Sequence, residues 1–149
     1  MVQQSAPPDD AGIAGAAAMF ARDRASMALG MTVETGQPGY AVVSMPVRED
    51  MLNGYHVMHG GLIFAVADTA FAIACQESDA VTLAAGAEIS FLRPVMAGQR
   101  LTATAERRAL SGRSGIYDVQ VSDEAGVVVA EFRGRSRATS MPIPGSQPT

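Results

Sequence analysis

Asp68 is the residue of this sequence whose position most clearly suggests chemistry. It lies within LIFAVADTAFAIACQ (residues 62–76), a run that is apolar on nearly every side of a helix. No basic residue stands three or four positions away to pair with it. A buried carboxylate without a partner is costly, and such perturbed groups are typical of functional sites. We therefore favour a catalytic Asp68 over one that points to solvent through a gap in the packing.

A second candidate precedes that helix, where His59, Gly60 and Gly61 follow one another. The first N–H groups of a helix have no partner within the helix and lie at the positive end of its dipole. Glycines there let a ligand approach the backbone, and such a site can bind the oxyanion of an acyl intermediate. The alternative is a flexible turn, for which two adjacent glycines are common.

Further polar residues lie in the loop before the glycines. Asn53 is followed by Gly54, which is first of all a turn signal. His56 and His59 are three positions apart, but with Asp68 or Cys75 they do not form a recognised metal-site spacing, so we expect no metal. Cys75 lies deep in the apolar run and is interpreted as a core residue.

The last predicted strand has arginines at every second position. Alternation places Arg133, Arg135 and Arg137 on one face and Phe132, Gly134 and Ser136 on the other. The simple interpretation is a solvated outer face. The functional one is a binding surface for phosphates, which arginine holds in bidentate geometry.

The elements that must position these residues can be predicted from periodicity and turn signals. A first helix is expected from an N-cap at Asp10 to about Gly30, followed by a hairpin with arms Thr32–Glu34 and Tyr40–Val47. The buried helix follows, and four strands are then expected at Val81–Leu92, Arg100–Arg108, Ile116–Ser122 and Val127–Arg137. Hairpins and meanders indicate an antiparallel sheet, and an apolar helix needs that sheet curved around it. The fold class is therefore α+β.

Length and composition are consistent with one domain over residues 11–139, between a disordered lead (1–10) and a disordered tail (140–149). The net charge of −4, from 11 basic and 15 acidic residues, disfavours nucleic-acid binding. We expect no membrane span, no signal peptide and, with a single cysteine, a cytoplasmic location.

The segment MLNGYHVMHGGLIFAVADTAFAIAC (51–75) resembles the signature of the phenylacetic acid degradation thioesterases, within the hotdog-fold thioesterase superfamily. The resemblance extends in order through ARDRASMALGM (21–31), ISFLRPVMAGQRLTATA (89–105), GIYDVQV (115–121) and AEFRGRSR (130–137), and covers roughly residues 15–138. It implies a hotdog fold, in which a curved antiparallel sheet wraps a long central helix. It also implies homodimers paired into homotetramers, with active sites at subunit interfaces.

The resemblance assigns roles to the central residues. Asp68 matches the catalytic carboxylate, as general base or nucleophile, and the Gly60 backbone N–H matches the donor to the thioester carbonyl. Asn53 matches a polar residue opposite Asp68 across the dimer, and His59 matches a histidine beside the thioester. An additional catalytic serine or threonine of some relatives is replaced here, near Ala84.

The implied activity is hydrolysis of phenylacetyl-CoA or ring-hydroxylated phenylacetyl-CoA, in phenylacetate catabolism, to free acid and coenzyme A. No cofactor is expected, since coenzyme A is part of the substrate. Gly61, Phe64, Phe71, Arg133 and Arg135 are expected to contact the substrate, although both phenylalanines have a core role as an alternative. Other acyl groups, medium-chain or benzoyl-type, remain open. A hotdog hydratase, which typically has a histidine after the aspartate, and a non-catalytic acyl-CoA-binding protein are the competing hypotheses.

Overall fold

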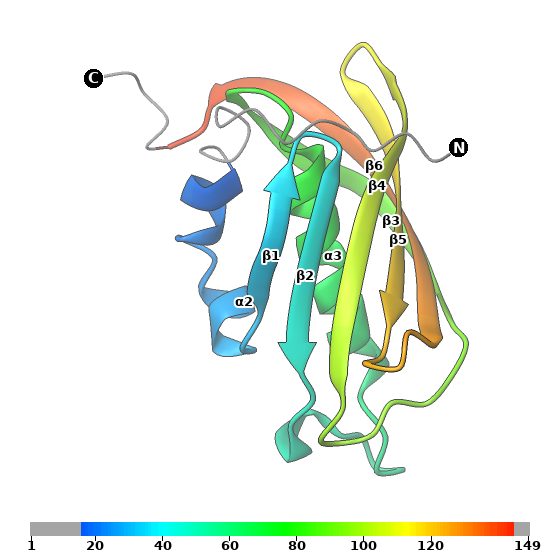
Figure 1. Ribbon diagram of the computed structural model, residues 1–149. Helices are drawn as coiled ribbons and strands as arrows, with labels where there is room; N and C mark the ends of the chain where they lie inside the picture. Colours follow the sequence, from blue (N-terminus) through cyan, green and yellow to red (C-terminus); the bar gives the residue numbers. More distant parts are fainter. Residues whose placement is uncertain (1–15, 145–149) are drawn as a thin grey trace.

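A six-stranded sheet curves around one long helix in the computed structural model, which describes residues 16–144 (Figure 1). The expected N-terminal lead, the N-cap expected at Asp10 and half of the expected tail (145–149) lie outside these residues. The strands have the order β1-β2-β4-β5-β6-β3, and every neighbouring pair is antiparallel. The α+β hotdog architecture predicted from the sequence is confirmed.

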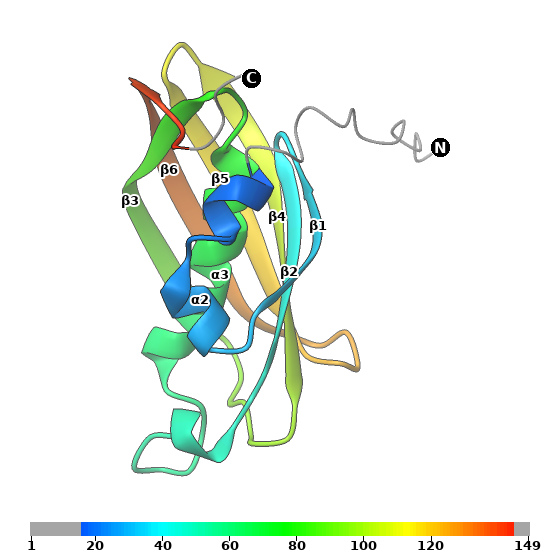
Figure 2. The ribbon, with the colours of Figure 1, turned by 90° about the vertical axis from the view of Figure 1, so that its left-hand side faces the viewer.

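The elements follow the predicted order, and four of the six strands, β1, β4, β5 and β6, are longer than predicted. They are α2 (Arg24–Ala28), β1 (Thr32–Gln37), β2 (Tyr40–Pro46), a short 3-10 turn η1 (Glu49–Met51), α3 (Gly60–Cys75), β3 (Ala80–Phe91), β4 (Arg100–Ser111), β5 (Ser114–Ser122) and β6 (Val128–Pro142). Figure 2 shows α3 against one face of the sheet, with α2 lying over α3 on the side away from the strands.

The core lies between α3 and the concave face of the sheet. Strand alternation turns one set of side chains toward the helix. Nine of these side chains, on the three central strands, are fully buried: Ala41, Val43, Met45, Leu101, Ala103, Ala105, Tyr117, Val119 and Val121. The helix lies so close to β6 that a Cβ built on Gly134 would come within 2.7 Å of the Phe71 ring. Glycine at 134 therefore permits the close packing of α3 on β6.

The single long first helix is a wrong prediction. Residues 16–20 are helical, the chain then turns, and a new helix α2 begins after Asp23. The Asp23 side chain accepts a hydrogen bond of 2.9 Å from the Ser26 N–H. Aspartate competes with the helical backbone for such bonds, so it ends one helix and caps the next.

The last strand is longer than expected, since β6 continues to Pro142, beyond residue 139. Pro142 is paired with Ala80 at the start of β3, and the Thr139 hydroxyl donates to the Val81 carbonyl at 2.6 Å. Residues 140–142 therefore belong to the sheet, where the sequence predicts a disordered tail.

The C-terminal end of α3 is fixed by a polar cluster. The buried Tyr117 hydroxyl donates to the Glu77 carboxylate, and the Arg107 guanidinium donates to the same group. Burial and the adjacent carboxylate raise the pKa of Tyr117.

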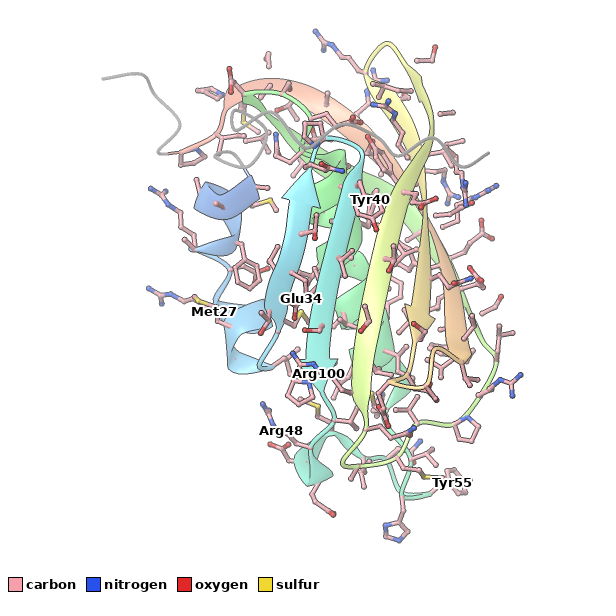
Figure 3. The ribbon with its side chains drawn as sticks, in the orientation of Figure 1. Met27, Glu34, Tyr40, Arg48, Tyr55 and Arg100 are labelled. Carbon is pink, nitrogen blue, oxygen red and sulfur yellow. The ribbon has the colours of Figure 1, made fainter. Side chains whose placement is uncertain are left out.

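The convex face of the sheet, unlike the concave face, is polar. There Arg100 points toward Glu34 (Figure 3), and its guanidinium donates to the Ser44 hydroxyl at 2.7 Å.

Candidate active site

Asp68 lies in the middle of α3 and is partly buried. Burial raises the pKa of its carboxyl group, and the negative charge of Asp23 raises it further. Within residues 16–144, no group donates a hydrogen bond to Asp68 or forms an ion pair with it. A carboxylate that is poorly solvated and unpartnered is a stronger base than an ordinary aspartate.

The N-terminus of α3 leaves one amide free. His59 is the N-cap, and its Nδ1 accepts a hydrogen bond of 3.1 Å from the Gly61 N–H. The His59 carbonyl accepts from the N–H groups of Leu62 and Ile63, at 2.9 and 3.3 Å. The Gly60 N–H has no partner within the described chain. It is therefore the amide that a bound oxyanion can reach, whereas the Gly61 amide is already used by His59.

A groove opens beside this free amide. Its volume is about 390 Å³, and it is lined by Val57, Met58, Gly60, Ile63, Phe91, Leu92, Arg93, Pro94 and Val95. The ring of Phe91 forms the wall next to Gly60 and is 52% exposed. A Cβ built on Gly60 would be 3.0 Å from the Phe91 Cζ atom, so glycine leaves room for the ring.

Asn53 orders the loop that leads into α3. Its Oδ1 accepts from the Tyr55 N–H at 2.8 Å, and its backbone N–H donates to the Val57 carbonyl at 2.7 Å. A bridge between Leu52 and Met58 closes the loop, and Tyr55 projects from it, 88% exposed (Figure 3). Within residues 16–144 the Asn53 Nδ2 has no partner, so this side of the amide is available to a ligand.

The candidate residues fall into two groups within one chain. Asn53, His59 and Gly60 lie at the N-terminal end of α3. Asp68 follows Gly60 by eight residues, which places it about 12 Å further along the helix axis. A single thioester carbonyl cannot be contacted from both positions. The two groups therefore cannot act on one carbonyl within a single chain.

The predicted acyl-binding phenylalanines differ in exposure. Phe64 is partly buried and meets the Phe132 ring edge-on, with 5.2 Å between ring centres. Phe71 is 1% exposed and packs against Tyr117 and Phe132. In this chain Phe71 is thus a core residue, the alternative kept open above. Cys75 is buried too, as predicted, and burial raises the pKa of its thiol to about 12.

The predicted face of arginines on β6 is present, but some of these arginines are already paired with carboxylates. Asp118 binds Arg133 through two hydrogen bonds, of 2.6 and 2.9 Å, and this pairing lowers the pKa of the Asp118 carboxyl group. Arg135 reaches Glu88 only at 3.5 Å, and Arg137 donates to the Ser114 hydroxyl at 3.2 Å. Arg135 and Arg137 are therefore freer than Arg133 to bind a phosphate.

Metal-binding clusters and membrane-spanning helices are both absent from the described residues. In residues 16–144 no group of three or more histidine, cysteine, aspartate or glutamate side chains is placed to hold a metal ion. No helix of this part of the chain is long and apolar enough to cross a membrane.

Comparison with known proteins identifies the family of the chain. Residues 55–130 match the Thioesterase superfamily, and the chain belongs to this family. The hotdog fold and the family together define a thioester hydrolase.

A named enzyme and two solved structures are similar to this chain over most of its length. The chain is 42% identical to the acyl-coenzyme A thioesterase PaaI of Escherichia coli, over 86% of this chain and 91% of the relative. The solved structure of the E. coli PaaI protein, described as coming from the phenylacetic acid degradation operon, superposes with a TM-score of 0.87 at 38% identity, over 91% of this chain and 99% of that one. The TT0310 protein of Thermus thermophilus superposes with a TM-score of 0.76 at 39% identity, over 79% and 99%.

Sequence reasoning missed Phe91 and Asp23 as parts of the site's surroundings. Alternation along β3 would have placed Phe91 on the same face as Ala87 and Ile89, toward the helix. Nothing in the local sequence pairs it with Gly60, which is 31 positions earlier. Asp23 had a weak signal, since aspartate is a preferred residue at the start of a helix.

Proposed function

We propose that the protein is an acyl-CoA thioesterase that hydrolyses phenylacetyl-CoA or ring-hydroxylated phenylacetyl-CoA to the free acid and coenzyme A. The observation that supports this most directly is a pair of groups on α3 that have no hydrogen-bond partner within residues 16–144, the Asp68 carboxylate and the Gly60 N–H. The name of the E. coli relative supports the substrate class. The acyl preference and a cytoplasmic role in phenylacetate catabolism are part of the proposal.

The proposed active unit is a homodimer, two of which form a tetramer. Within the described sheet, β3 is an edge strand that pairs only with β6. Leu83 on this strand is 51% exposed. An exposed apolar edge strand tends to pair with another chain. Pairing of two such edges would cover this surface. We propose that it also brings Asp68 of one subunit to Gly60 and Asn53 of the other.

The chemistry needs few groups, because a thiolate is a good leaving group. In the general-base route, Asp68 takes a proton from water as the water oxygen attacks the thioester carbonyl carbon. The Gly60 N–H donates to the resulting oxyanion. The intermediate then expels the coenzyme A thiolate, which is protonated. In the nucleophilic route, the Asp68 carboxylate attacks the carbonyl carbon and the C–S bond breaks, which releases the coenzyme A thiolate and leaves a mixed anhydride. Water then hydrolyses the anhydride to the free acid and the Asp68 carboxylate.

The acyl group and the nucleotide would bind on different surfaces. The groove at Phe91 and the Phe64 ring are apolar surfaces for an acyl chain or ring. For the phosphates we propose Arg135, with Arg137 as a neighbour. Arg133 is a weaker candidate than the sequence indicated, because binding a phosphate there would have to displace Asp118.

The proposal is tested by thiol release from a panel of acyl-CoAs, with wild-type protein, Asp68→Ala and the matched control Asp79→Ala. Asp79 is an exposed loop residue. We expect phenylacetyl-CoA to be the preferred substrate and Asp68→Ala to lower kcat roughly 100- to 10,000-fold, in an oligomer of unchanged size. Unchanged turnover in Asp68→Ala would refute the mechanism. Preference for straight medium-chain substrates would refute the acyl assignment, and water addition to an enoyl-CoA without thiol release would indicate a hydratase.

A further inference from the structure

A chain of hydroxyl groups links α2 to α3 next to Asp68. The Ser26 Oγ donates to the Asp23 Oδ2 at 2.6 Å and lies 2.8 Å from the Thr69 Oγ1. Because the single Ser26 proton goes to the carboxylate, Thr69 must donate to Ser26. The chain therefore runs from Thr69 through Ser26 to Asp23, and it ends on a negative charge.

This chain is buried where it joins the helices. Ser26 is 3% exposed and Thr69 is 7% exposed, and Ser26 is the buried residue of α2. Buried hydroxyls stabilise a contact only when they are hydrogen-bonded, so the three side chains fix α2 in one position on α3. Thr69 adjoins Asp68 in the chain, and this fixed contact therefore lies beside the candidate base.

We propose that Asp23 is a positioning residue for Asp68: through Ser26 and Thr69 it holds α2 against α3, and it keeps a second negative charge beside the base. This inference rests on the proposed function for its catalytic meaning. A negative charge near a carboxyl group disfavours its ionised form, so the charge of Asp23 makes Asp68 a stronger base.

The surroundings of Asp68 contain no opposing charge in the described chain. Asp23, from α2, is the charged group that acts on it. Cys75, from α3, is the other titratable neighbour, and its thiol is neutral because burial raises its pKa to about 12. The effect of Asp23 on Asp68 is therefore not offset by a neighbouring cation within residues 16–144.

Asp23→Asn separates charge from hydrogen bonding. The Asn Oδ1 can still accept from the Ser26 N–H, and its Nδ2 can donate to the Ser26 hydroxyl, which then turns toward Thr69. The substitution thus retains the cap and the contact while removing the charge. Thr69→Val does the reverse, since it breaks the hydroxyl chain and keeps Asp23. Asp79→Asn is the control for a charge change in an exposed loop.

The measurement is the pH profile of kcat/KM for phenylacetyl-CoA, with a ¹³C NMR titration of the Asp68 carboxyl group. With Asp23→Asn, the acid limb of the profile should move to lower pH. Activity on that limb, relative to the plateau, should rise about threefold, the order of effect expected when one like charge is removed from a solvent-screened pair. The Asp68 titration should move the same way. Thr69→Val should lower kcat without that movement, and Asp79→Asn should change neither.

An unmoved acid limb and an unmoved Asp68 titration in a folded Asp23→Asn protein would overturn the inference. An activity loss that is equal at every pH would show that Asp23 serves only as a structural cap, and this result would also contradict the inference. If the wild-type protein releases no thiol, the proposed function fails. The NMR titration would still decide whether Asp23 acts on Asp68.

Discussion

The ring of Phe91 lies so close to Gly60 that a Cβ built there would be 3.0 Å from its Cζ atom, beside the one amide of the α3 N-terminus that has no partner in the described chain. Residue 60 therefore needs both an open N–H and the absence of a side chain. These two requirements can be separated experimentally, because alanine adds a Cβ and keeps the N–H, whereas proline adds a ring and removes the N–H.

Gly60→Ala and Gly60→Pro form a matched pair. A Cβ meets the Phe91 ring at 3.0 Å in both variants, so both should suffer a similar loss from displacement of that ring. Proline is favoured at the first position of a helix, and α3 should persist. We expect Gly60→Pro to lower kcat by a further factor of about 100 to 1,000, the effect of removing one oxyanion donor. Equal kcat values for the two folded variants would contradict an oxyanion role for this amide.

The two polar atoms of the Asn53 side chain can have different roles. Its Oδ1 holds the Tyr55 N–H, while its Nδ2 is unused within residues 16–144. Asn53→Asp keeps the acceptor and loses the donor, so we expect an unchanged melting temperature and a fall in kcat/KM of about tenfold or more, the loss of one charge-assisted or buried hydrogen bond. Asn53→Ala should lower both. Full activity in Asn53→Asp would show that Asn53 serves only the loop.

His59 is an N-cap in the structure, and the resemblance places it beside the thioester. Asparagine is a preferred cap, so His59→Asn should preserve stability, whereas His59→Ala should lower the free energy of unfolding by about 1 kcal/mol. Unfolding in denaturant at a fixed protein concentration measures this difference. Thiol release then separates the roles: activity retained in His59→Asn indicates a cap, and activity lost in that stable variant indicates chemistry at the imidazole.

Asp68 should weaken the fold at neutral pH. Its pKa in the folded chain is raised above the ordinary 3.8, so in the window above 3.8 the folded state binds more protons than the unfolded state. Stability therefore falls as pH rises through the raised pKa. We expect Asp68→Asn to be more stable than wild type at pH 8, with the difference disappearing below about pH 3.8, where the aspartate is protonated in both states. Wild type being the more stable at pH 8 would contradict this.

Much of the fold could be predicted because its strongest signals are local. The apolar run around Asp68 predicted a buried helix, and two-residue alternation placed Phe132 inward and Arg133 outward on β6, as observed. The same periodicity misled at Asp23, where a side-chain hydrogen bond to Ser26 interrupts the helix.

The features that the sequence did not predict depend on contacts between residues far apart in the sequence. The approach of Phe91 to Gly60, the bond between Ser26 and Thr69, and the pairing of Asp118 with Arg133 each join separate elements. The extension of β6 to Pro142 likewise depends on β3, since proline ends a strand in isolation but is tolerated at a strand end.

The central claim is that Asp68 and Gly60 act on one thioester from different subunits, because within one chain they are about 12 Å apart along the helix. The most direct test is complementation in a purified heterodimer, with Asp68→Ala in one differently tagged subunit and Gly60→Pro in the other. Each homodimer should be inactive. The heterodimer contains one site with Asp68 and Gly60 both intact, and it should recover about half of the wild-type activity per dimer. A heterodimer as inactive as its parents would contradict the shared site.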